Sequence, residues 1–120
     1  MTRAELFDFI EKIDDPKADY SKILSNLHYT HYFLMDKYKK LLQPYGLTSV
    51  QVNVLSIIVF HYPQAISLEE IKVMVLEPGS DVSRTVVRLA NKGFIQKVID
   101  PGNRRKRSIV STEKGVKTIE

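Results

Sequence analysis

The sequence predicts a mainly helical α+β domain with one short β-hairpin near its C-terminal end. Three observations support this prediction: helix-start motifs recur along the chain, apolar residues follow them at helical spacing, and a Pro-Gly-Asn turn separates two short apolar segments. The 120 residues, with 43% hydrophobic and 27% charged positions, are typical of a globular protein and exclude two full-sized domains.

The helix-start motif is a Ser or Thr followed three residues later by Glu or Gln, which lets two side chains satisfy free amides at a helix N-terminus. It occurs three times, at Thr2 and Glu5, Thr48 and Gln51, and Ser67 and Glu70. Together with the apolar spacing, these motifs predict helices over residues 2–13, 16–42, 48–61, 67–75 and 80–91.

A strand is the alternative for residues 48–61, because Val50, Val52 and Val54 alternate as they would in a strand. The length of the apolar segment and the cap at Thr48 favour a helix. Ser80 is predicted to cap the helix at 80–91, which ends in a basic last turn and Gly93.

The chain is predicted to become extended after Gly93. Residues 94–100 and 107–111 are predicted strands joined by the turn PGNRRK, and Thr112 is predicted to cap one last helix. The expected organisation is an N-terminal helical region (1–46), a second lobe (47–115) and the start of a C-terminal helix (116–120).

The predicted order of elements is that of a winged helix-turn-helix: a helix, a short helix, a tight turn, a helix and a basic hairpin. In this motif, the second helix of the helix-turn-helix pair enters the DNA major groove. On residues 80–91, Val82, Val86 and Leu89 fall on one side of the helix and polar residues on the other. The predicted DNA contacts of this helix are Ser80, Asp81, Ser83, Arg84, Thr85 and Arg88. We expect Arg84 to bind guanine O6 and N7, and Arg88 to meet phosphate.

The hairpin is predicted to present four cations on a tight turn, namely Arg104, Arg105, Lys106 and Arg107. No acidic side chain separates them, so their mutual repulsion favours a polyanionic partner, and arginines on a slender hairpin suit the DNA minor groove. Residues 79–120 carry 10 basic and 4 acidic side chains, whereas residues 1–36 carry 4 and 7. An ordinary solvated helix face and loop are the alternative interpretation.

Several motifs resemble the MarR family of bacterial winged helix-turn-helix transcription regulators. Arg88 and Leu89, followed by Lys92, Gly93 and Phe94, are similar to the family's end of the recognition helix. The match continues through residues 100–105 of the hairpin and the Thr-Glu-Lys-Gly at 112–115, and LTSVQVNVLSII at 47–58 is similar to the first helix of the family's DNA-binding lobe.

The resemblance implies a homodimer that binds double-stranded DNA at a pseudo-palindromic operator, most commonly as a repressor. It also implies a small aromatic effector, for which the candidate contacts are Tyr29, Tyr32, Phe33, Tyr38 and Tyr45, although packing is the more common role of such residues. Asn103 and Val87 stand where the family often has acidic residues. Relatives usually continue through two more helices, so the chain is expected to be a short or truncated member.

The N-terminal helices carry more apolar residues than one small lobe can bury, which predicts that they form the dimer. The predicted interface residues are Leu6, Phe9, Ile10, Ile13, Ile23, Leu27, Leu34 and Tyr38. The alternative is that these side chains fold back as core of their own domain.

Other functions find less support in the sequence. The absence of cysteine excludes thiolate chemistry, no enzyme or cofactor motif occurs, and no segment is long and apolar enough for a membrane span, so a cytoplasmic protein without cofactor is expected. His28, His31 and His61 could hold a metal, but packing is the favoured role. The remaining alternative function is a winged helix that binds an acidic protein partner instead of DNA.

Overall fold

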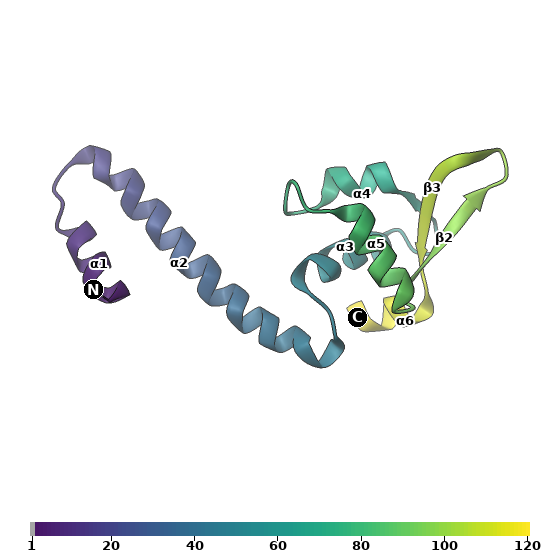
Figure 1. Ribbon diagram of the computed structural model, residues 1–120, viewed down its shortest axis with the longest axis horizontal. Helices are drawn as coiled ribbons and strands as arrows, with labels where there is room; N and C mark the ends of the chain where they lie inside the picture. Colours follow the sequence, from purple (N-terminus) through teal and green to yellow (C-terminus); the bar gives the residue numbers. More distant parts are fainter. Residues whose placement is uncertain (1) are drawn as a thin grey trace. The chain divides into compact units, whose positions relative to one another are not determined.

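The computed structural model describes residues 2–120, without the side chains of Lys17, Asp100 and Arg104. The chain divides into two compact units, with the boundary between Leu41 and Leu42. The N-terminal unit is a helical hairpin, and the C-terminal unit combines helices with a small sheet (Figure 1).

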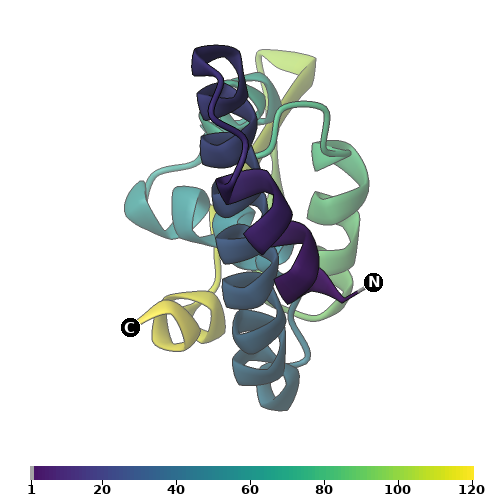
Figure 2. The same ribbon diagram turned by 90° about the vertical axis from the view of Figure 1, so that its left-hand side faces the viewer.

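The N-terminal unit consists of α1 (Arg3–Glu11) and the long α2 (Pro16–Leu42). Figure 2 shows α1 lying alongside the first part of α2. The rings of Phe7 and Tyr29 meet edge to face at 5.4 Å, and Lys22 Nζ donates hydrogen bonds to the carbonyls of Glu11 and Ile13 at 3.2 and 2.8 Å. These contacts fix the connection between the two helices.

The C-terminal unit contains the 3-10 turn η1 (Gln43–Tyr45) and four helices: α3 (Ser49–Phe60), α4 (Leu68–Met74), α5 (Val82–Asn91) and α6 (Glu113–Ile119). All three predicted capping boxes are present, at Thr2, Thr48 and Ser67. The three helix starts predicted from these boxes are therefore confirmed.

The cap of α5 was predicted one residue too early. Asp81 Oδ1 accepts from the backbone N–H of Arg84 at 3.0 Å and caps the helix, whereas the Ser80 hydroxyl donates to the Glu77 carbonyl at 2.8 Å. Ser80 thus closes the preceding turn, and the carboxylate one position later satisfies the free amide.

The sheet has three antiparallel strands in the order β1-β3-β2, formed by β1 (Ile66–Ser67), β2 (Ile95–Asp100) and β3 (Asn103–Ser111). Two features differ from the prediction. The two-residue strand β1 pairs through Ile66 and Ile109, and it is too short to produce an alternating pattern in the sequence. In addition, β3 begins at Asn103 and not at Arg107, so the basic residues lie on a strand and the turn comprises Pro101 and Gly102.

A single apolar core holds the C-terminal unit together. Val54, Leu55 and Ile58 of α3 are fully buried, which confirms a helix in the segment whose valines alternate. The other helices and the sheet contribute fully buried side chains that include Ile71, Leu89 and Ile109. Burial of each such side chain stabilises the fold by roughly 1.5 to 3 kcal/mol.

Candidate nucleic-acid interface

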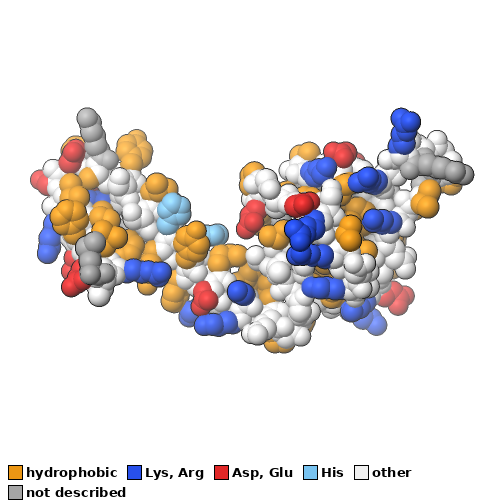
Figure 3. All heavy atoms as spheres, viewed as in Figure 1, with side chains coloured by type: hydrophobic (Ala, Val, Ile, Leu, Met, Phe, Trp, Pro, Cys, Tyr) orange, Lys and Arg blue, Asp and Glu red, His pale blue; other side chains and the backbone are white. Residues whose placement is uncertain are grey.

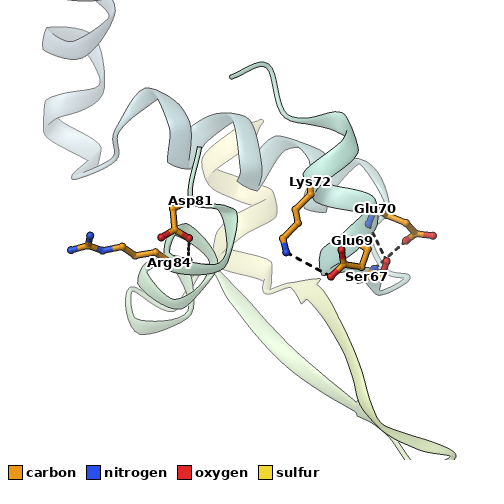
Figure 4. A network of polar contacts seen from close by, with 6 residues as sticks. All are labelled: Ser67, Glu69, Glu70, Lys72, Asp81 and Arg84. Atoms are coloured by element: carbon orange, nitrogen blue, oxygen red, sulfur yellow. Dashed lines mark hydrogen bonds and ion pairs between the residues drawn. The ribbon is translucent and has the colours of Figure 1, made fainter. Parts of the chain in front are cut away.

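Helix α5 has one buried face and one exposed face. Val82 and Val86 are each 3% exposed and Leu89 is fully buried, whereas Arg84 and Arg88 are exposed. Figure 4 shows the Arg84 side chain extending into solvent while Asp81 caps the helix behind it. The helix therefore presents two guanidinium groups on a face that the core does not use.

Thr85 does not belong to this exposed face. Its side chain is only 9% exposed, and its hydroxyl donates to the Asp81 carbonyl at 2.9 Å. Thr85, a predicted DNA contact, thus lies on the buried side of α5, because its position one residue after Arg84 turns it toward the core. Ser83 is half-buried.

The C-terminal end of α5 is tied to two other helices. Gly93 adopts φ +82, a left-handed conformation that favours glycine. Lys92 Nζ donates to the Gly46 carbonyl at 2.5 Å and to Gln51 Oε1 at 3.0 Å, and Lys114 Nζ donates to the Lys92 carbonyl at 2.8 Å. These contacts fix the direction of α5 relative to α3 and α6.

The hairpin of β2 and β3 forms a wing that extends away from the helices (Figure 1). Its register is regular from Ile95 opposite Ser111 to Ile99 opposite Arg107, and then shifts so that Asp100 pairs with Asn103. The residues between Asn103 and Arg107 are thus extra residues on β3. Asn103 Oδ1 accepts from the backbone N–H of Arg105 at 3.1 Å, so the amide orders the start of this irregular segment.

The wing cations have no acidic partner. Arg105, Lys106 and Arg107 are exposed, and among the side chains that the structure describes no carboxylate lies within ion-pair distance of them. The side chain of Arg104, also a predicted contact, lies outside the described residues. Figure 3 shows Lys and Arg side chains gathered on the face of this unit that carries α5. Such a face can bind an anionic polymer.

These elements form the pattern found in known structures. No family model and no curated protein matches the chain, but solved structures do. A MarR-like transcription regulator from Bacillus cereus superposes with a TM-score of 0.75 at 17% identity, over 84% of this chain and 71% of that one. The chain has the MarR-type winged-helix fold.

Two further structures support this fold assignment. The Staphylococcus aureus MepR–DNA complex has a TM-score of 0.68 at 23% identity, over 79% of this chain and 70% of that one. A MarR family transcriptional regulator from Silicibacter pomeroyi has a TM-score of 0.64 at 23% identity, over 88% and 70%. At these sequence identities the structural similarity establishes the fold. It confirms that the chain folds as the resemblance to MarR-family proteins predicts.

Two hollows flank the MarR-type wing. One, of about 180 Å³, lies between α5 and the wing and is lined by Ser83 and Val87 on one side and by Val98 and Ile99 on the other. The second, of about 210 Å³, lies between the start of α4 and the basic part of β3. In both hollows Lys106 and Arg107 contribute to the lining.

The start of α4 carries its own polar contacts, which Figure 4 shows. Lys72 Nζ lies 3.7 Å from Glu69 Oε1, and Ser67 and Glu70 exchange the two hydrogen bonds of the capping box. The hydrogen bonds from Ser67 lower the pKa of the Glu70 carboxyl, with smaller contributions from the charges of His61 and Lys106. The carboxylates of Glu69 and Glu70 are thus engaged at the start of α4.

The histidines that could hold a metal do not gather into a site. Among the side chains that the structure describes, no three His, Asp or Glu are arranged to hold a metal ion. His61 Nδ1 lies 2.8 Å from the Ile57 carbonyl, and the rings of His28 and His31 both contact Tyr32. No helix in this described part of the chain has the length and apolar character of a membrane span.

Packing between α1 and α2 leaves most of the predicted dimer residues exposed. Leu6, Phe9, Ile13, Ile23, Leu27 and Leu34 are 36 to 63% exposed, and Ile10 and Tyr38 are half-buried. Helix α1 has no buried residue. The N-terminal unit therefore does not bury these side chains by itself. Figure 3 shows the hydrophobic side chains along this unit.

Proposed function

We propose that this chain is a transcription regulator, not an enzyme, that binds double-stranded DNA through α5 and the wing. The observation that carries the proposal is the two-sided character of α5. Val82, Val86 and Leu89 are buried, whereas Arg84 and Arg88 are exposed and form no ion pair with any side chain that the structure describes. The MarR-type fold and the MepR–DNA complex among the similar structures support it.

In the proposed complex, α5 enters the major groove with its N-terminal half toward the bases. Arg84 donates two hydrogen bonds to guanine O6 and N7, and Arg88, one turn later, binds a phosphate. Arg105, Lys106 and Arg107 follow the adjacent minor groove or its phosphates. Ser80 and Ser83 are further contacts, and Asp81 acts as the helix cap.

The proposed active form is a homodimer on a pseudo-palindromic operator, acting as a repressor. Its support is the exposed apolar surface of α1 and α2, which a second copy could cover. The aromatic side chains of α2, which include Tyr29, Tyr32 and Phe33, are the candidate contacts for a small aromatic effector that releases the DNA.

Selection of duplexes from a random pool tests the proposal. We expect one palindromic sequence to be enriched, with about six to eight phosphate contacts and a log–log salt slope near −0.9 per contact. A winged helix that binds an acidic protein would enrich no sequence and would show no such slope with duplex DNA. That outcome would contradict the proposed DNA binding and would favour the alternative function, binding of an acidic protein.

The wing makes a prediction of its own. Arg105→Ala is expected to weaken binding to all duplexes by a similar factor and to lower the salt slope by about one contact, because a phosphate contact carries no sequence information. Titration of the selected and of a scrambled duplex at several salt concentrations measures both effects. A loss confined to the selected duplex would instead assign Arg105 to base readout.

The dimer is tested by mass in solution. The wild-type chain is expected to scatter light as a species of twice its 13.8 kDa at micromolar concentration. Leu27→Lys places a charge in the predicted interface, where Leu27 is 63% exposed, and is expected to shift the population to monomer. Tyr32→Lys, on the opposite side of α2 and 69% exposed, is the control that stays dimeric. A wild-type monomer would contradict the prediction.

A further inference from the structure

Val87 is an apolar side chain next to two arginines on the exposed face of α5. It is 44% exposed, whereas Val82 and Val86 of the same helix are 3% exposed. Its neighbours on the exposed face of α5 are Arg84 and Arg88. Since the core leaves nearly half of this side chain in water, packing within the chain does not account for a valine here.

The position of Val87 on α5 places it beside the predicted base contact. Residues three apart on a helix have Cβ atoms about 5 to 6 Å from each other, so Val87 follows Arg84 by one such step. Base pairs are stacked about 3.4 Å apart. If Arg84 reaches one base pair, Val87 can therefore reach a base one or two pairs away.

The chemistry of the major groove limits what an exposed valine can recognise there. Hydrogen-bond donors and acceptors cover the base edges, and the thymine C5-methyl group is the apolar feature among them. Val87 also lines the hollow between α5 and the wing, together with Val98 and Ile99, which are 40% and 74% exposed. The exposed apolar surface of Val87 on α5 therefore continues onto Val98 and Ile99 of the wing.

We propose that Val87 reads a thymine methyl group one or two base pairs from the guanine bound by Arg84. This inference rests on the proposed function and adds a base preference to it. Covering one methyl group is worth about 0.8 kcal/mol, which corresponds to roughly fourfold in affinity for each half-site.

The test replaces thymine by uracil, which lacks only the methyl group, at each position of the duplex that the intact protein selects. For the wild-type protein, one of the tested positions in each half-site is expected to be sensitive. Replacing the thymine at that single position is expected to weaken binding about fourfold. For Val87→Ala, the same substitution is expected to change nothing, because the side chain that covers the methyl group is gone. Alanine favours helix, so α5 is retained.

Val73→Ala is the matched control, because Val73 is also an exposed valine, at 85%, but belongs to α4 and not to α5. It is expected to keep the full difference between thymine and uracil. If no thymine methyl affects wild-type binding, or if Val87→Ala keeps the difference, the inference is overturned while the proposed function stands. If no duplex is enriched at all, both are overturned.

Discussion

Replacing Arg84 by alanine is expected to cost about 1 to 3 kcal/mol of operator affinity per half-site and to relax the preference for one base pair. Arg84 is exposed and has no acidic partner among the described side chains, so its guanidinium is available for a guanine edge. The fold should not change, because Asp81 caps α5 through the backbone N–H of residue 84, which alanine retains. Titration of the selected duplex measures the loss, and repeated selection with the variant reveals the relaxed position.

Lys117→Ala is the control for charge alone. Lys117 is an exposed cation on α6, outside α5 and the wing. Its removal lowers the net charge by the same amount as Arg84→Ala, yet it is expected to leave the base preference unchanged. If the two variants lose affinity equally and select the same duplexes, α5 does not read bases and the proposed docking is wrong.

The helix starts were predictable because each depends on residues three apart. A capping box is a local arrangement, and the pairs at Thr2, Thr48 and Ser67 form it without help from the rest of the fold. The exposed and buried faces of α5 were predictable for a related reason, since helical spacing alone separates Val82, Val86 and Leu89 from Arg84 and Arg88.

The errors arose where the result depends on distant or competing contacts. Ser80 and Asp81 are both suitable caps, and the choice between them was decided by the Glu77 carbonyl, which engages Ser80. Strand β1 exists because Ile66 pairs with Ile109, more than forty residues along the chain. The start of β3 was not predicted, because the Asn103 side chain orders a segment that the Pro-Gly-Asn sequence had assigned to the turn.

The residues that orient the candidate site were the least predictable part. Lys92 was expected only to favour the end of α5 as a basic residue, whereas its ammonium group joins that helix to Gly46 and Gln51. The spacing of a single helix contains no information about such partners. The Thr-Glu-Lys-Gly motif at 112–115 likewise did not explain why residue 115 is a glycine. The close packing of α6 against its neighbours explains it.

Gly115→Ala is expected to destabilise the C-terminal unit by about 3 kcal/mol, the upper part of the range for overpacked positions. Gly115 is buried in α6, and a Cβ added there would lie much closer than van der Waals contact to the Phe94 carbonyl and the Ser111 hydroxyl, with a Leu55 methyl at 3.3 Å. If the hydroxyl rotates away, it loses its hydrogen bond to the Thr112 carbonyl at 2.9 Å. The Phe94 carbonyl cannot move away, because it accepts hydrogen bonds from the backbone N–H and the hydroxyl of Thr112, both at 3.0 Å.

Alanine at position 115 must therefore push the first turn of α6 away from the corner between α5 and β2. Because Lys114 in that turn donates to the carbonyl of Lys92, the displacement also loosens the end of the recognition helix. The free energy of unfolding in urea measures the cost, with Lys117→Ala on the exposed side of α6 expected to stay within about 0.5 kcal/mol of wild type. Equal stability of the two variants would show that α6 does not approach Phe94 as closely as the structure places it.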